Sequence, residues 1–176
     1  ALNELRDSGA LNIPVVYNTS SFDSLEALRL MEGAVDVYLA DFKYASALEA
    51  GKLSHASRYP EIALAAIEEM VAQVPVWEED DEGLLLKGVI VRHLVLPGRV
   101  EESKRALAVL YERFGDNVRL SIMSQYTPLA SGLERYGLAG RVTEEEYEEV
   151  LDYADSLGIE DYFWQQGDAA QESFVP

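Results

Sequence analysis

Apolar and polar positions follow one another along this chain in a pattern that predicts short strands separated by helices. The clearest strand spans residues 89–98, VIVRHLVLPG, in which Arg92 and His93 interrupt an apolar run that a Pro-Gly pair ends. Such a run is typical of a strand that is buried on both faces of a parallel sheet. A guanidinium inside such a strand needs a carboxylate partner from the protein or from a ligand, so Arg92 is a candidate site residue.

The rest of the chain repeats the alternation of strand and helix. Further strands are predicted at residues 13–17, 35–42, 118–123 and 162–164. Helices are predicted at residues 24–31, 59–73, 100–114 and 143–157, with a helix tail at 1–9 and a short helix within 44–58. Thr143 and Glu146 have the spacing of a capping box, which begins the last helix. This order predicts an α/β fold with parallel strands and flanking helices, as in part of a TIM-like (β/α) barrel or in a doubly wound sheet; we favour the partial barrel, truncated at its N-terminal side, as a single domain over residues 1–176.

Composition and charge exclude several classes of function. The chain has 176 residues with 48% apolar content, enough for one sizeable core. Its formal net charge of -18 repels phosphate backbones and anionic membrane surfaces, so we expect neither nucleic acid nor a membrane as a partner. No apolar stretch is long enough for a membrane span and no signal pattern opens the chain, which favours a cytoplasmic protein. Because the first residue is Ala and the opening helix begins in mid-unit, we expect a piece of a longer chain.

Polar side chains that a core does not require gather where the predicted strands end. They are Asn18 and Thr19, Asp41 and Lys43, Arg92, and Gln125 and Tyr126. The carboxyl ends of parallel strands meet at one rim, so these residues should converge. Two cations near one carboxylate suit an anionic or zwitterionic ligand, with Lys43 and Arg92 on its carboxylate and Asp41 on an ammonium, hydroxyl or cation.

Simpler explanations of the same residues stay open. A structural ion pair from Asp41 to Lys43 or to Arg92 explains the charged group as well as a ligand does. Gln125 and Tyr126 precede a proline and can serve backbone hydrogen bonds alone. His93 faces away from Arg92 by strand alternation, which favours a hydrogen-bonded core histidine over a catalytic base.

Other chemistry finds little support in the sequence. The chain has no cysteine, and it lacks the nucleophile elbow, the dinucleotide-binding glycines and the Walker phosphate loop. The acidic run at residues 78–83 lacks the spacing of a calcium loop and is typical of a solvated turn. We therefore assign no catalytic residue and no metal ligand within this chain.

The strand ends also carry a resemblance to a known family. Residues 16–20 (VYNTS), 38–44 (YLADFKY), 91–98 (VRHLVLPG) and 120–126 (LSIMSQY) are similar to successive strand-end motifs of the radical S-adenosylmethionine (SAM) proteins. The group that they resemble most is the pyruvate formate-lyase activating enzyme-like proteins. The resemblance covers nearly the whole chain.

This resemblance implies a partial (β/α)6 barrel that binds a [4Fe-4S] cluster through a Cys-x-x-x-Cys-x-x-Cys loop. It implies an oxidoreductase that cleaves SAM reductively to a 5′-deoxyadenosyl radical, which in activating enzymes takes a hydrogen atom from a glycine of a glycyl-radical partner enzyme. The residues that the resemblance assigns to SAM are Asp41 and Lys43, Arg92 at the methionyl carboxylate, Asn18 and Thr19 beside that carboxylate or a nearby monovalent cation, and Gln125 or Tyr126 near the ribose.

The chain departs from the family pattern in three places. The cysteine loop is missing, so is the Gly-Gly-Glu stretch that holds the SAM amino group, and Asn18 stands where activating enzymes usually have Asp. We expect these residues to be the second portion of a radical SAM protein, lacking its first two βα units and inactive alone. The edge strand at 13–17 and the uncovered barrel interior then predict self-association.

Two other functions remain open on the sequence. One is a non-catalytic binding or assembly module in which the acidic surface docks a partner and the polar rim is structural. The other is a metal-dependent barrel enzyme, such as an aldolase or a hydrolase, for which only Asp41 is well placed as a ligand.

Overall fold

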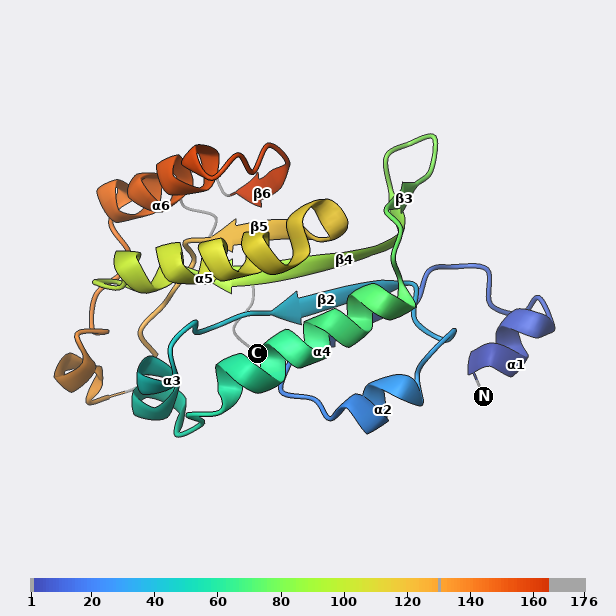
Figure 1. The fold of residues 1–176 in the computed structure, drawn as a ribbon, viewed down its shortest axis with the longest axis horizontal. Coiled ribbons are helices and arrows are strands. Elements are labelled where there is room, and N and C mark those ends of the chain that lie inside the picture. Colours follow the sequence, from blue (N-terminus) through green and yellow to red (C-terminus); the bar gives the residue numbers. More distant parts are fainter. Residues whose placement is uncertain (1, 130, 165–176) are drawn as a thin grey trace.

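The computed structural model describes residues 2–129 and 131–164, which form one sheet with helices along it (Figure 1). The strands are β1 (Val16–Thr19), β2 (Val37–Asp41), β3 (Glu78–Glu79), β4 (Leu85–Leu94), β5 (Arg119–Met123) and β6 (Tyr162–Trp164). The helices are α1 (Leu2–Asp7), α2 (Leu25–Arg29), α3 (Ala47–Ser54), α4 (Tyr59–Gln73), α5 (Val100–Phe114) and α6 (Glu144–Ser156), with 3-10 turns η1 (Gly115–Asn117) and η2 (Leu133–Tyr136).

The sheet is parallel apart from β3. Its strands lie side by side in the order β1-β2-β4-β5-β6, and β3 pairs antiparallel with β4. Apart from β3, this order is the order of the strands in the chain. In a doubly wound fold the strand order would instead run outward in both directions from the middle of the sheet. The α/β fold with parallel strands and flanking helices that the sequence predicts is confirmed, with the strand order of a barrel.

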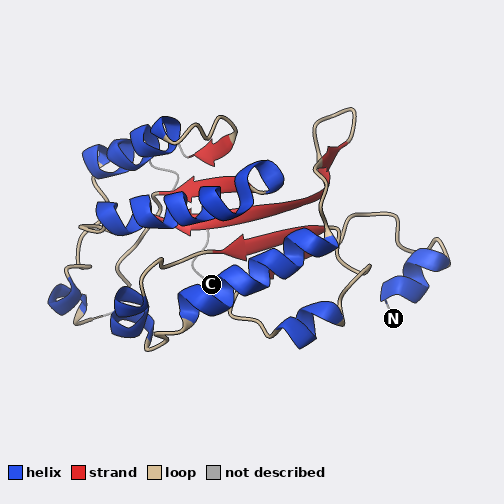
Figure 2. Cartoon of the chain, viewed as in Figure 1, coloured by secondary structure: helices blue, strands red, loops and turns tan. Residues whose placement is uncertain are grey.

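Helices cover one face of this sheet. Figures 1 and 2 show α4 and α5 in front of the strands, and both helices contact β4. Residues of the central strands on this face, and the residues that follow β2 and β4, are buried and belong to the core: Tyr38, Ala40, Val89, Val91, Leu120 and Ile122, with Phe42 and Val95. The α/β layer on this side therefore contains the apolar core.

The opposite face of the sheet is open, which contradicts one expectation. Burial along β4 alternates, with Val91 and His93 buried but Ile90, Arg92 and Leu94 only half-buried. On the same open face, Val16 of β1 is 56% exposed and Phe163 is 50% exposed. The prediction of a strand buried on both faces is wrong, because helices pack on only one side of it in the described part of the chain.

Local signals place most of the helix boundaries. The expected capping box is confirmed, since the Thr143 N–H donates to Glu146 Oε2 over 3.0 Å and the Glu146 N–H donates to Thr143 Oγ1 over 3.2 Å. Proline in the first turn begins α4 at its predicted residue, because a missing N–H costs nothing there.

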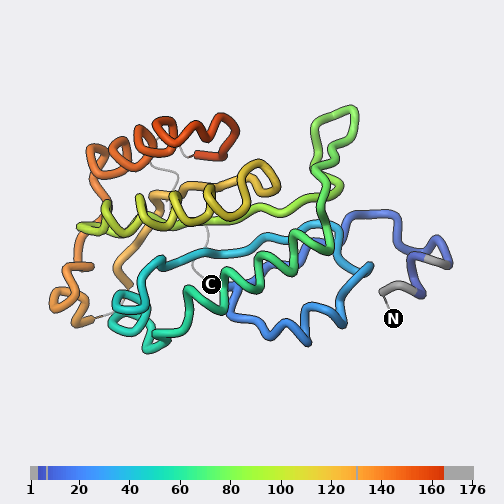
Figure 3. Tube along the Cα trace, in the orientation of Figure 1, coloured from blue at the N-terminus to red at the C-terminus, as the bar shows by residue number. Residues whose placement is uncertain are grey.

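The strand boundaries shift more than the helix boundaries. Strand β4 begins four residues before the predicted strand, because it extends into a hairpin with β3, and it ends at Leu94. Glu78 and Glu79 of the acidic run form β3, and the rest of the run, 80–83, is the expected turn, in which Asp80 Oδ1 accepts the N–H groups of Glu82 and Leu84. Figure 3 shows the hairpin rising away from the body of the chain.

None of the helices within residues 2–129 and 131–164 has both the length and the apolar character that a membrane span needs.

Candidate functional site

Four of the polar residues singled out in the sequence meet at the carboxyl ends of β1, β2 and β4. Arg92 Nε donates to Asp41 Oδ1 over 2.8 Å, and its Nη2 donates to Asn18 Oδ1 over 2.8 Å. The Nζ of Lys43 lies 3.4 Å from Asp41 Oδ2. We call Asn18, Asp41, Lys43 and Arg92 the rim cluster.

The parallel register brings these side chains together on the open face. Asp41 is the Cα partner of Arg92 across β2 and β4, and paired residues of a parallel sheet point to the same side. Asn18 pairs with Leu39, which lies two residues before Asp41 and so shares its face. Adjacent strands lie about 4.8 Å apart, so a guanidinium on β4 reaches both the carboxylate on β2 and the amide on β1.

The rim cluster carries an excess positive charge that a ligand can reach. Two cations, Lys43 and Arg92, surround the single carboxylate of Asp41. The side chains are 45% exposed for Lys43 and 25% for Arg92, so the charges are neither fully desolvated nor fully screened. A group of this kind binds a carboxylate or another oxyanion by charge-assisted hydrogen bonds.

Thr19 does not join the rim cluster. Its neighbour Asn18 points to the open face, so strand alternation turns Thr19 to the helix side, where its Oγ1 donates to Asp23 Oδ2 and accepts the Ser21 N–H. Asp23 also accepts from the Tyr17 hydroxyl, and burial of the phenol, together with the charge of Asp23, raises the Tyr17 pKa. Thr19 therefore shapes the turn after β1.

Gln125 and Tyr126 follow β5 at the same edge of the sheet. Gln125 Nε2 lies 3.7 Å from the Met123 sulfur. The Tyr126 hydroxyl donates to the Leu138 carbonyl over 2.9 Å, and burial raises the pKa of this phenol. Their assignment to a ribose stays a prediction.

His93 is the hydrogen-bonded core histidine that the sequence favours. It is buried on the helix side, where Nδ1 lies 2.8 Å from the Phe42 carbonyl and Nε2 lies 2.9 Å from Ser103 Oγ. Burial disfavours the imidazolium and lowers the pKa of His93. A neutral, enclosed ring of this kind does not reach the rim cluster.

Two buried groups that sequence reasoning missed hold the loop after β2, which carries Lys43. The Tyr59 hydroxyl contacts the backbone of Asp41 and of Lys43. From the other side, Glu102 Oε1 accepts the N–H groups of Ala45 and Ser46 over 2.8 and 2.7 Å.

The Glu102 carboxylate is held in its charged form. Burial alone would raise its pKa, but the Ser46 N–H, Arg105 and the Ala45 N–H stabilise the carboxylate and the net effect lowers the pKa. A signal for this residue was present in the sequence, because Glu102 lies on the stripe of α5 that also carries the buried Ala106 and Leu110. A carboxylate on such a stripe needs buried donors.

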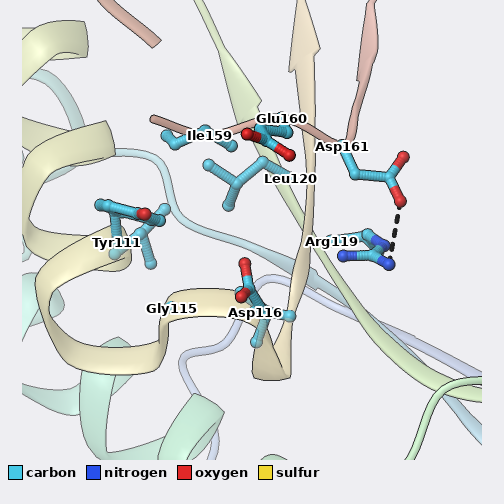
Figure 4. Close-up of a pocket in the computed structure, with 10 residues that line it drawn as sticks. Tyr111, Gly115, Asp116, Arg119, Leu120, Ile159, Glu160 and Asp161 are labelled. Atoms are coloured by element: carbon cyan, nitrogen blue, oxygen red, sulfur yellow. Dashed lines mark ion pairs between the residues drawn. The ribbon is translucent and has the colours of Figure 1, made fainter. Parts of the chain in front are cut away.

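Two cavities are lined by residues outside the rim cluster, and the larger, of about 380 Å³, lies beside the start of α4, lined by Phe22, Asp23, Arg58 and Glu61. Figure 4 shows the other, at the amino end of β5, between Tyr111 at the end of α5 and the Arg119–Asp161 ion pair of 2.9 Å. Its volume of about 10 Å³ admits about one water molecule. Within the described ranges, no three His, Cys, Asp or Glu side chains are arranged to hold a metal ion.

Comparisons with known proteins place the fold. The sequence matches no protein-family profile. It is 30% identical over 149 residues to an uncharacterized protein of Methanocaldococcus jannaschii, a match that covers 85% of this chain and 40% of that protein. The fold is similar to that of a radical SAM methyltransferase from Sphaerobacter thermophilus, with a TM-score of 0.54, 13% identity, and coverage of 85% of this chain and 39% of that one. The chain thus spans less than half of either relative, and the similarity extends to the TIM-like α/β fold.

Proposed function

We propose that this chain forms the SAM-binding part of a radical SAM protein. The rim cluster carries this proposal, because it places two cations, one carboxylate and one amide at the carboxyl ends of three neighbouring parallel strands. This is the edge where barrels bind their ligands. The strand-end motifs that resemble radical SAM proteins supply the same residues, and the similar fold of a radical SAM methyltransferase agrees with the assignment.

The chemistry of the rim cluster fits the amino acid end of SAM. Its α-carboxylate would lie against Arg92 and Lys43 and neutralise the excess positive charge of the cluster. The ammonium group of SAM would lie near the Asp41 carboxylate. That carboxylate would then stay paired when the Lys43 side chain turns to the ligand. Asn18 holds the guanidinium from the other side, so Arg92 does not need to reorient.

The cluster that radical SAM chemistry requires does not fit this chain. A [4Fe-4S] cluster is held by thiolates, and the sequence has no cysteine. We therefore assign SAM binding to this chain and propose that reductive cleavage of SAM belongs to the full-length protein, in which other residues hold the cluster. Activation of a glycyl-radical enzyme is the narrower form of this proposal, and methyl transfer, the activity named for the similar structure, is its competitor.

The test is isothermal titration of the full-length protein with SAM, comparing Arg92→Ala with Arg119→Ala. We expect Arg92→Ala to raise the Kd roughly 30-fold, or about 2 kcal/mol, because it removes one partner of a partly buried charge pair. Arg119 is the matched control, since it lies on the same face, has a similar exposure of 24% and pairs with Asp161 at the other end of the sheet. Its removal should leave the Kd unchanged.

The alternative is a binding or assembly module in which the Asp41–Arg92 pair is only structural. In that case the wild-type protein gives no heat with SAM, and Arg92→Ala changes stability alone. An equal rise in Kd for both arginine variants would also remove the rim cluster from the site, since it would report a general loss of structure.

A further inference from the structure

One buried hydroxyl joins the two strands of the rim cluster at the point where their backbone pairing stops. The register of β1 with β2 ends at the pair Thr19 and Ala40. Just beyond it, the Tyr59 hydroxyl oxygen lies 3.0 Å from the Ser20 carbonyl oxygen and 2.9 Å from the Asp41 carbonyl oxygen. The phenol therefore continues the link between the strands where the ladder has ended.

The same oxygen also holds the loop that carries the lysine of the site. It accepts the backbone N–H of Lys43 over 3.0 Å. A phenol has one hydrogen to donate, so the Ser20 and Asp41 carbonyls share it while the oxygen lone pair takes the Lys43 N–H. Three backbone groups, two from β2 and its extension and one from the turn after β1, thus depend on a single atom.

Packing fixes the position of this phenol. Tyr59 is 4% exposed, and its ring stacks on Phe22 at 6.1 Å between centroids and meets Tyr44 edge-on at 5.7 Å. Burial raises the pKa of Tyr59, so the hydroxyl keeps its hydrogen at any working pH. The ring belongs to α4, which is anchored in the core by Ala63 and Ile67.

We propose that Tyr59 is a positioning residue for the rim cluster: by joining the ends of β1 and β2 through one hydroxyl, it sets the spacing of Asn18, Asp41 and Lys43. Tyr59 itself touches no ligand in this arrangement. The ligand of the rim cluster is the SAM of the proposed function, so the effect of Tyr59 on ligand binding rests on that proposed function. The geometry of the loop can be tested separately.

The experiment compares Tyr59→Phe with Tyr44→Phe in the full-length protein. Tyr44 is the matched control, because it is buried in the same aromatic group but its hydroxyl bonds Ser54 Oγ at 2.8 Å and no strand end. Two quantities are measured: the Kd for SAM by titration, and the hydrogen exchange rate of the Lys43 amide by NMR. The second does not depend on SAM.

We expect Tyr59→Phe to raise the Kd on the order of tenfold, since it leaves backbone groups at both strand ends without a partner. It should also speed exchange at the Lys43 amide. Tyr44→Phe should leave the Kd within roughly twofold, even where both variants lose similar thermal stability. Equal changes in Kd for the two variants, or a Tyr59→Phe variant with unchanged exchange at Lys43, would overturn the positioning role.

Failure of the proposed function looks different. If the wild-type protein does not bind SAM while Lys43 exchange still rises only in Tyr59→Phe, the ligand is wrong and the positioning of the loop stands. Should Tyr59→Phe not fold, Phe22→Ala takes its place, because Phe22 is half-exposed and stacks on the Tyr59 ring, and this variant keeps the hydroxyl. Faster Lys43 exchange in that variant supports the proposal, and an unchanged rate contradicts it.

Discussion

The two faces of the sheet use the same strands in opposite ways. Along β4, Val91 and His93 point into the core beneath α4 and α5, while Ile90 and Arg92, their neighbours in sequence, lie half-buried on the open face. The strand residues that α4 and α5 bury are apolar apart from one neutral histidine. The open side places the charged rim cluster at its carboxyl edge and leaves apolar side chains such as Val16 in contact with solvent.

The two faces therefore have different roles, since the helix side stabilises the fold and the open side carries the charged groups. Apolar burial, at about 25 cal/mol per Å², stabilises the helix side, where Val91, Leu120 and Ile122 are buried. Charged side chains cost little free energy on the open side, because they keep partial contact with water and pair with one another. The face that contributes least to the core is therefore the one free to bind a ligand.

An isoleucine lies on each face of the sheet, so two Ile-to-Ala variants compare how much each face contributes to stability. Ile122→Ala on β5 empties a fully buried site and should lower the free energy of unfolding by about 3 to 4 kcal/mol. Ile90→Ala on β4 removes a side chain that already contacts solvent and should cost about 1 kcal/mol. Urea unfolding measures both values. Equal costs would mean that the open face is covered in solution.

Just below pH 6.5, the pH dependence of stability should report His93 on the helix side. Burial keeps the folded-state pKa of His93 below its ordinary value of 6.5, so below that pH the unfolded state binds a proton that the folded state does not. Stability should fall as the pH is lowered from 6.5 towards the folded pKa, by up to about 1.4 kcal/mol per pH unit.

Variants at the two histidines separate this effect from other groups. His93→Gln should remove the slope between pH 7 and 5 in urea unfolding. His55→Asn is the control, since His55 is exposed and its left-handed backbone, with a φ of 54°, suits Asn. A slope that survives in His93→Gln would trace the dependence to the acidic surface instead.

The smallest expected effect concerns the open face. We propose that this face and the edge of β1 mediate self-association of the chain, as its exposed apolar side chains suggest. Val16→Asp should weaken the association roughly fivefold, or about 1 kcal/mol, whereas Leu48→Asp, at an exposed site on α3, should not. Light scattering after size exclusion measures the mass. A monodisperse monomer that binds little apolar dye would contradict the proposal.

Much of the fold was predictable because its signals are local. The amphipathic pattern gave α5 its observed bounds, and the capping box of α6 is a contact between residues three apart. The burial of β4 was not predictable in the same way. Ile90 and Leu94 are as apolar as core residues, and no local pattern tells whether a second layer covers them.

For the candidate site too, local patterns predicted some features and the tertiary structure decided the others. The alternation of strand and helix placed Asn18, Asp41, Lys43 and Arg92 at strand ends, and that placement depends only on periodicity and turn residues. The tertiary structure decided that Arg92 bonds Asp41, 51 residues away, and Asn18, 74 residues away. It also decided that Tyr59 and Glu102 hold the loop between them. A local pattern fixes which side of a strand a residue faces, whereas the order of the strands in the sheet fixes which residues it meets there.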